Sequence, residues 1–183
     1  MTLACAYHGA TGANAIAEYI RPDSDVETSN WFSTPLFEKL DDNSASDYIN
    51  SSNSTAVWPS YNTYDFECGL SNPTKPPQVA KLQGMYLRVN LQLQEGDSPG
   101  TPGNADFTYR LKQGSTVIAS NTFSTGVLDS ASTRTYTLTE AEVDSITDHQ
   151  DLRVLVTVNI GHSSGNPNLQ ARVNWAEVEY YAR

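Results

Sequence analysis

The sequence predicts an all-β domain, an antiparallel β-sandwich of the jelly-roll kind with one short helix and an extended N-terminal arm. Three observations lead to this fold class. Several short segments alternate apolar and polar residues, turn-forming clusters recur at roughly ten-residue spacing, and only one stretch carries strong helix-capping signals. A chain of 183 residues suits one domain, which can bury enough surface to fold without disulfides or metals.

The clearest strand covers residues 85–93. Its odd positions are all apolar and its even positions are Tyr, Arg, Asn and Gln, which predicts one core face and one polar face. A shift of one residue would expose all the apolar side chains, at about 1.5 kcal/mol or more each, so the register is well determined. Residues 62–70 and 152–160 alternate in the same way.

Further strands are expected later in the chain. Residues 107–111 and 116–120 alternate on either side of a Gln-Gly-Ser turn, which predicts a hairpin, and residues 133–138 form another strand. In residues 169–181 the apolar positions change from odd to even numbers. This change predicts a bulge near Ala176 or a strand buried on both faces.

The helix signal is a capping box. Thr139 stands at the N-cap and Glu142 three residues later, while Leu138 and Val143 have the spacing of a hydrophobic staple. We therefore expect a short helix after Thr139. A second helical turn is expected over residues 36–40.

Two domain regions are predicted. Residues 1–20, rich in Gly and Ala, form the N-terminal arm that a partner could hold, and residues 21–183 form the sandwich. The formal net charge of −10 argues against nucleic acid and anionic membranes as partners. No apolar run reaches the length of a membrane span, and no basic start precedes an apolar run as in a secretory signal, so we expect synthesis in the cytoplasm.

Cysteine usage does not predict a disulfide framework. The chain has two cysteines, Cys5 and Cys68. Two free thiols, at least one of them buried, are favoured over a Cys5–Cys68 bridge.

No motif for catalysis, cofactor binding or metal binding is found. The histidines His8, His149 and His162 lack a surrounding motif, and phosphate-loop and zinc spacings are missing. Two acidic clusters could supply oxygen ligands to Ca²⁺ or a glycosidase pair, but solvated turns are favoured. They are Asp23, Asp25 and Glu27, and Asp41, Asp42 and Asp47. We expect no catalytic, cofactor or metal residues, and no enzyme.

Aromatic side chains offer a different kind of site, because a ring can stack on a sugar. The candidates are Trp31, Trp58, Tyr61, Tyr64 and Tyr86. Packing in a core or interface is favoured for the group as a whole. Trp31, Trp58 and Tyr61 are kept as candidate contacts for a glycan or a protein partner.

From Arg21 to Arg183 the order of several short stretches resembles a β-sandwich module of structural proteins in tailed bacteriophages, found as head decoration or fibre-like components. The stretches are residues 21–26, Trp31, 47–49, 136–148, 151–154 and 173–178. The N-terminal arm has no match in this module. The resemblance implies a fold more than a role.

Together these observations lead to an expected function. We expect a virion structural protein on the outer capsid surface, a decoration (cement) protein that binds the major capsid protein and itself, with a homotrimer favoured. The alternative is a carbohydrate- or receptor-binding module on the capsid or tail, with a host surface glycan as its ligand.

Overall fold

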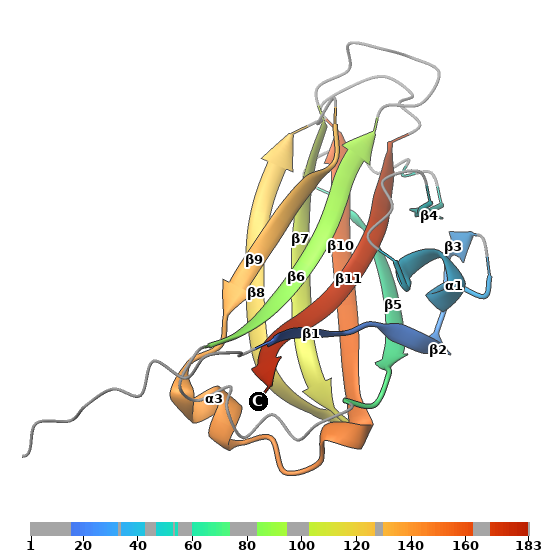
Figure 1. The fold of residues 1–183 in the computed structure, drawn as a ribbon. Coiled ribbons are helices and arrows are strands. Elements are labelled where there is room, and N and C mark those ends of the chain that lie inside the picture. Colours follow the sequence, from blue (N-terminus) through green and yellow to red (C-terminus); the bar gives the residue numbers. More distant parts are fainter. Residues whose placement is uncertain are drawn as a thin grey trace, which may run out of the picture.

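The computed structural model describes residues 16–32, 34–42, 47–52, 54, 60–73, 84–94, 103–126, 130–162 and 169–182. Two antiparallel sheets face each other (Figure 1). The strands are β1 (Ile16–Ile20), β2 (Pro22–Glu27), β3 (Trp31–Phe32), β4 (Ile49–Ser51), β5 (Asn62–Leu70), β6 (Met85–Gln94), β7 (Gly103–Gln113), β8 (Thr116–Gly126), β9 (Ser132–Thr137), β10 (Leu152–His162) and β11 (Gln170–Ala182). The helices are α1 (Phe37–Leu40), α3 (Glu140–Asp144) and the 3₁₀ helix η1 (His149–Asp151).

The strand order confirms the predicted β-sandwich. One sheet runs β3-β4-β11-β6-β9, with β1 also paired to β11, and the other runs β2-β5-β10-β7-β8. None of the helices in the described ranges is long and apolar enough to cross a membrane.

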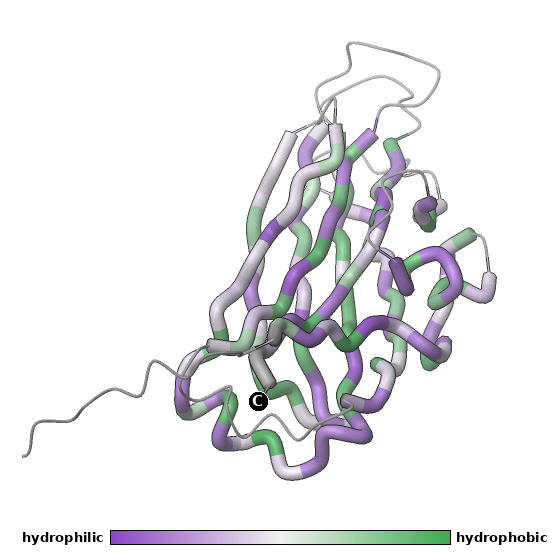
Figure 2. Tube along the Cα trace, in the orientation of Figure 1, coloured by the Kyte–Doolittle hydropathy of each residue, from purple (hydrophilic) through white to green (hydrophobic). Residues whose placement is uncertain are grey.

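Period-two alternation builds the core, as predicted. Along β6 every odd residue from Met85 to Leu93 is fully buried, and the even residues are partly exposed. The alternating colours along the central strands in Figure 2 show the same pattern. On β10 the even positions from Leu152 to Ile160 are buried against them from the other sheet. The predicted register of both strands is confirmed.

The predicted irregularity in the last strand is a bulge. The pairing of β11 with β6 shifts between Val173 and Trp175, so that Asn174 is the extra residue. The bulge lies two residues before Ala176. Without the extra residue, an odd-numbered and an even-numbered position of one strand would face opposite sides of the sheet. The insertion therefore lets Val173 and Val178 both face the core.

The capping box around α3 is confirmed. The Glu142 N–H donates to Thr139 Oγ1 at 3.3 Å, and the Thr139 N–H donates to Glu142 Oε2 at 2.7 Å. Tyr136 Oη also donates to this carboxylate, at 2.9 Å. Partial burial raises the pKa of Glu142, but the hydrogen bonds from Thr139 and Tyr136 outweigh it, so the pKa lies below 4.5.

The sandwich begins at residue 16, five residues before the predicted start at residue 21. Residues 16–20, assigned to the arm, form β1 and pair with β11 from Ile16↔Ala182 to Ile20↔Val178. At Arg21 the chain then passes to the other sheet as β2, so this segment joins the two sheets along one edge. Residues 16–20 have no clear alternation of apolar and polar side chains, and their pairing partner comes from the far end of the chain. Residues 1–15 lie outside the described part.

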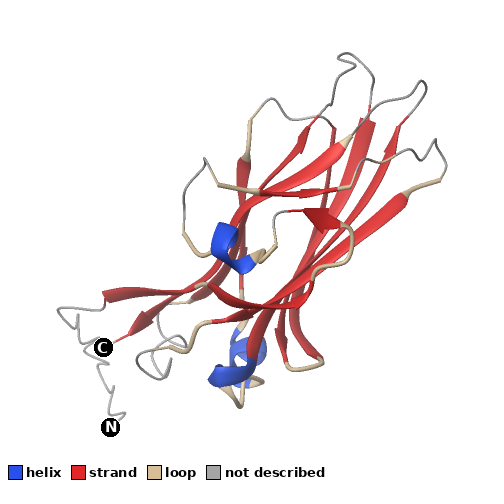
Figure 3. Cartoon of the chain, turned by 90° about the vertical axis from the view of Figure 1, so that its right-hand side faces the viewer, coloured by secondary structure: helices blue, strands red, loops and turns tan. Residues whose placement is uncertain are grey.

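Helix α1 covers the edge at which the chain changes sheets (Figure 3). Its residue Leu40 and the preceding Leu36 are fully buried, and α1 packs against both β2 and β11. The helical turn expected over residues 36–40 is thereby confirmed. The opposite edge of the sandwich is formed by β8 and β9 (Figure 1).

Candidate functional site: a polar pocket beside Gly69

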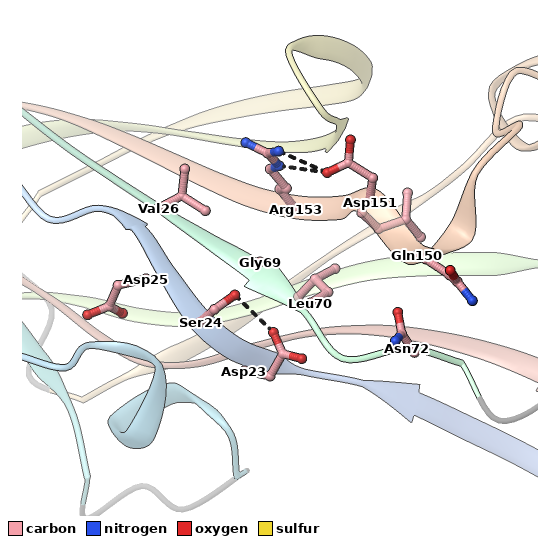
Figure 4. A pocket seen from close by; sticks show the side chains of 11 residues that line it. Asp23, Ser24, Asp25, Val26, Gly69, Leu70, Asn72, Gln150, Asp151 and Arg153 are labelled. Carbon is pink, nitrogen blue, oxygen red and sulfur yellow. Dashed lines mark hydrogen bonds and ion pairs between the residues drawn. The ribbon is translucent and has the colours of Figure 1, made fainter.

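A pocket of about 470 Å³ lies where β2, the end of β5 and the start of β10 run side by side (Figure 4). Eleven residues line it, and most of them are polar. They are Asp23, Ser24, Asp25, Val26, Gly69, Leu70, Asn72, Gln150, Asp151, Leu152 and Arg153. Three segments far apart in the sequence thus meet at one place.

One position of the sheet that lines the pocket has no side chain. Ser24, Gly69 and Arg153 are direct partners across β2, β5 and β10, so they form one row on the outer face of the sheet. Gly69 has no side chain in the middle of this row, and the Ser24 hydroxyl lies over it instead. A Cβ at Gly69 would fall well inside van der Waals contact with Ser24 Oγ, so any other residue there would force Ser24 to shift.

Charged side chains form one wall of the pocket. Arg153 Nε and Nη2 donate to Asp151 Oδ1 at 3.1 and 2.9 Å. Arg153 Nη1 also donates to Glu67 Oε1 at 3.5 Å, and Glu67 accepts a further bond from Lys112. The hydrogen bond to Asp151, aided by Glu67, raises the pKa of Arg153, so the guanidinium stays charged and is held against the sheet.

The first acidic cluster divides into structural and pocket residues. Asp25 accepts hydrogen bonds from the N–H groups of Leu36 and Phe37, at 2.8 and 2.9 Å, where α1 begins. Figure 4 shows its carboxylate directed away from the centre of the pocket. Glu27 accepts bonds from Ser29, whose side chain and N–H lower the pKa of this carboxyl. Within the described ranges, no group of three His, Cys, Asp or Glu residues could hold a metal ion.

Asp23 is the member of that cluster whose carboxylate faces the pocket. It is exposed, and Ser24 Oγ donates to its Oδ1 at 3.0 Å. Asn72 and Gln150, both exposed, stand at the end of the pocket where β5 leaves the sheet (Figure 4). The pocket therefore combines an open carboxylate, two amides and one guanidinium.

A second hollow of about 310 Å³ adjoins the first and shares Gln150 with it. Its other lining residues are Pro73, Thr147, Asp148 and His149. Burial lowers the pKa of His149 and outweighs the opposite effect of the Asp148 carboxylate. His149 is therefore mainly neutral at pH 7 and can both donate and accept a hydrogen bond.

The aromatic residues predicted from the sequence do not form this site. Trp31 is only 5% exposed and packs edge-on against Phe66, with ring centroids 5.0 Å apart, so little of its ring is open to a ligand; that it contacts a glycan or a partner stays a prediction. Tyr61 is 49% exposed, but it precedes β5 at the end of that strand opposite to Gly69. Trp58 lies outside the described residues. Tyr64 is buried in the core.

Cys68, next to the pocket floor, is a buried free thiol. Burial and the nearby carboxylate of Asp25 raise its pKa far above the usual range, so the thiol stays protonated and unreactive. The prediction of at least one buried free cysteine is confirmed, and Cys5 lies outside the described residues.

Sequence reasoning missed the pocket as a whole. Its residues come from positions 23–26, 69–72 and 150–153, and no short motif connects them. Gly69, in an otherwise regular strand pattern, was the one available signal, because a glycine inside a strand often marks a close approach of another chain segment.

Comparisons with known proteins give structural likenesses alone. No family model matches the chain, and no curated protein matches it. Among solved structures, TmCBM61 in complex with β-1,4-galactotriose has a TM-score of 0.39 and 6% identity, covering 83% of this chain and 89% of that one. A structure described as CBM4 has a TM-score of 0.34 and 12% identity, covering 90% and 95%.

The enzymatically active domain of tailspike protein 4 from bacteriophage CBA120 has a TM-score of 0.36 and 15% identity. The match covers 93% of this chain and 20% of that one. The neighbours are thus carbohydrate-binding modules and a phage tailspike domain. At such TM-scores the likeness says nothing about a shared site, and the residues of this chain decide what its pocket can bind.

Proposed function

We propose that this domain is a non-catalytic carbohydrate-binding module whose pocket beside Gly69 holds a neutral sugar. The observation that carries the proposal is the set of hydrogen-bonding groups around one hollow: Asp23, Asn72, Gln150 and Arg153. A sugar ring presents several hydroxyls, each of which donates and accepts. Carboxylates accept, guanidinium groups donate and amides do both, so this set matches such a ligand.

The size and shape of the pocket are consistent with a small ligand. Its volume of about 470 Å³ lies within the range of pockets that bind small molecules. Val26 adds an exposed apolar side chain to the lining, against which the C–H groups of a sugar ring could lie. The adjoining hollow at His149 gives room for a second sugar unit.

The charge of the pocket favours a neutral sugar over an acidic one. Arg153 is already paired with Asp151 and Glu67, and the Asp23 carboxylate is not part of an ion pair in the described structure. The whole chain carries a net charge of −10. A sialic acid, uronic acid or phosphorylated sugar would therefore bring a negative charge next to Asp23 without a free cation to bind it.

We also propose that the domain does not hydrolyse its ligand. Glycoside hydrolysis uses two carboxyl groups, one as acid and one as base or nucleophile. Asp25 is engaged by the N–H groups at the start of α1, and Asp151 by Arg153. Among the carboxylates that line the pocket, this leaves Asp23 alone on the open wall.

The test is binding to an array of neutral and acidic glycans, followed by calorimetry with the glycan that binds best. Asn72→Ala and Gln150→Ala remove exposed side chains and should leave the fold intact. Each should weaken binding about tenfold, since one hydrogen bond to a ligand contributes about 1.5 kcal/mol. Tyr61→Ala is the matched control, because Tyr61 is exposed but lies at the other end of β5.

Two results would overturn the proposal. One is an array on which the protein binds no glycan, or binds acidic glycans in preference to neutral ones. The other is binding that is lost in Tyr61→Ala and kept in both pocket variants. Display of the module on a virion, and a role as capsid cement, stay predictions from the sequence resemblance, which mass spectrometry of purified particles would test.

A further inference from the structure

The bulge in β11 turns a tryptophan out of the core. Val173 faces the core, and in a regular strand Trp175, two residues later, would face it as well. The extra residue Asn174 reverses this, because Trp175 now pairs with Asn90, whose side chain lies on the outer face of β6. Bulges often redirect a side chain in this way beside functional sites.

The bulge places two side chains against their usual preference. Trp175, the largest side chain of β11, is partly exposed on the outer face, while the amide residue Asn174 is only 4% exposed. A strand that served stability alone would bury the tryptophan and expose the asparagine. Such a conflict between a residue and its surroundings is expected at positions that serve a function.

The indole of Trp175 is not engaged by the rest of the domain. Among the described residues, none makes a hydrogen bond or a ring contact with it, and its Nε1 is not buried. Trp31 differs, since it is packed against Phe66. Trp175 therefore keeps part of its ring and an open N–H donor for a ligand.

The surface around Trp175 is polar. Strands β9, β6 and β11 lie side by side at the front of Figure 1. On their paired outer positions β9 has exposed threonines, β6 has Tyr, Arg, Asn and Gln, and β11 has Gln, Arg and Glu besides the tryptophan. Asn90, opposite Trp175, donates from Nδ2 to Thr133 Oγ1 at 3.0 Å. No aliphatic side chain stands at these paired positions.

The charged groups of this face are held in place by partners. Arg88 Nη1 lies 2.8 Å from Glu179 Oε2 and 3.6 Å from Glu177 Oε1. Arg172, the outer residue that precedes the tryptophan on β11, donates from Nε to Asn50 Oδ1 at 3.0 Å. Both carboxylates of the paired rows are thus neutralised by a cation, and the face offers fixed polar groups around one indole ring.

We propose that this outer face, centred on Trp175, is a second glycan-binding surface that takes an uncharged oligosaccharide. A sugar ring has C–H groups on its faces and hydroxyls around its rim. It can therefore stack on one indole and hydrogen-bond to the amides, hydroxyls and guanidinium groups that surround it. A protein partner would need a contiguous apolar area, which a single ring among polar side chains does not supply. The net charge of −10 disfavours an acidic polysaccharide.

The two sites lie on opposite sides of the sandwich. The pocket beside Gly69 lies on the outer face of the sheet that contains β5 and β10, and Trp175 lies on the outer face of the other sheet. One consequence, which rests on the proposed function, is that a single chain can hold two glycans and connect them. The site at Trp175 itself does not depend on the pocket.

The experiment uses the full chain with Asn72→Ala/Gln150→Ala, which removes two hydrogen-bonding groups of the pocket. Neutral oligosaccharides of glucose, galactose, mannose or xylose are titrated into it and followed by calorimetry and by the indole N–H signals in NMR spectra. At least one should bind and shift the Trp175 signal, which is assigned from its loss in Trp175→Tyr, while the signal of buried Trp31 stays in place. Adding Trp175→Ala should weaken this binding about tenfold or more, and Trp175→Tyr should retain most of it, because a ring is kept.

The matched control is Tyr61→Ala, which removes an exposed ring that precedes β5, in the other sheet. Binding should be unchanged in this variant. The proposal is overturned if no oligosaccharide moves the Trp175 signal, if Trp175→Ala binds as tightly as the background, or if Tyr61→Ala is the variant that loses binding. The NMR titration does not require Trp175→Ala to fold.

Failure of this proposal can be told apart from failure of the proposed function. If the pocket substitutions abolish glycan binding and the Trp175 signal never moves in the parent protein, this proposal fails and the pocket stands. If binding depends on Trp175 and the pocket substitutions do not weaken it, the surface at Trp175 stands and the pocket fails.

Discussion

Glu67 offers the sharpest test of how the charged wall of the pocket is held. Its side chain is 9% exposed and binds Lys112, which is 14% exposed, and Arg153. Glu67→Gln keeps the size of the side chain and one accepting oxygen, but it removes the negative charge between two cations. Breaking a fully buried ion pair costs about 3–5 kcal/mol, and an exposed pair contributes about 0.2–1 kcal/mol. Because this pair is mostly but not fully buried, we expect a loss of about 2–3 kcal/mol.

For a chain of 183 residues this loss should appear as a fall in Tm of about 4–12 °C. Thermal unfolding followed by circular dichroism measures it. The control is Asp47→Asn, which breaks the ion pair of Asp47 with Lys39, 3.9 Å long and with side chains 47% and 43% exposed. That variant should change stability by less than about 0.5 kcal/mol. If Glu67→Gln melts as the control does, the cation cluster contributes nothing to stability and the reasoning is refuted.

Three further outcomes are expected. Leu87→Ala should lower the free energy of unfolding by about 2–5 kcal/mol in urea titrations, because the Leu87 side chain is fully buried on the core face of β6; an effect below 1 kcal/mol would contradict the core described here. Since the folded pKa of Glu142 lies below its unfolded value, its contribution is present above about pH 4.5 and is lost as the pH falls through the folded pKa. Glu142→Gln should therefore lose most stability near pH 6 and progressively less as the pH falls below about 4.5, and a loss that does not change with pH would show that the charge is irrelevant. In a Cys5→Ser variant, no thiol should react with a thiol reagent until the protein is unfolded, because Cys68 is buried and protonated; rapid reaction of the native protein would count against the buried position of Cys68.

Much of the fold could be predicted because its signals are local. The alternation in β6 and β10 predicts which face is buried, and the sequence around Thr139 contains both partners of the capping box. Each of these patterns lies within about ten neighbouring residues, so it can be recognised without knowing the rest of the structure.

The parts that were missed depend on pairing between distant segments. Nothing near Ile16 indicates that its partner is Ala182, and nothing near Trp31 indicates that Phe66 covers its ring. The pocket lies where Ser24, Gly69 and Arg153 fall in the same row across three strands. A row across three strands is set by the register of the whole sheet, which one segment of sequence cannot reveal.

The pairing of β1 with β11 also bears on how the domain is made. The two strands are separated by roughly 160 residues, and a ribosome adding about 5–20 residues each second needs some 8–30 s to reach β11 after β1 has been synthesised. Strand β6, whose longest pairing is with β11, waits as well. We therefore expect the nascent chain to hold its sheet unfinished until the last strand emerges, and to fold slowly, as chains with many distant contacts do. During that interval the apolar residues of β6 would be open to chaperones.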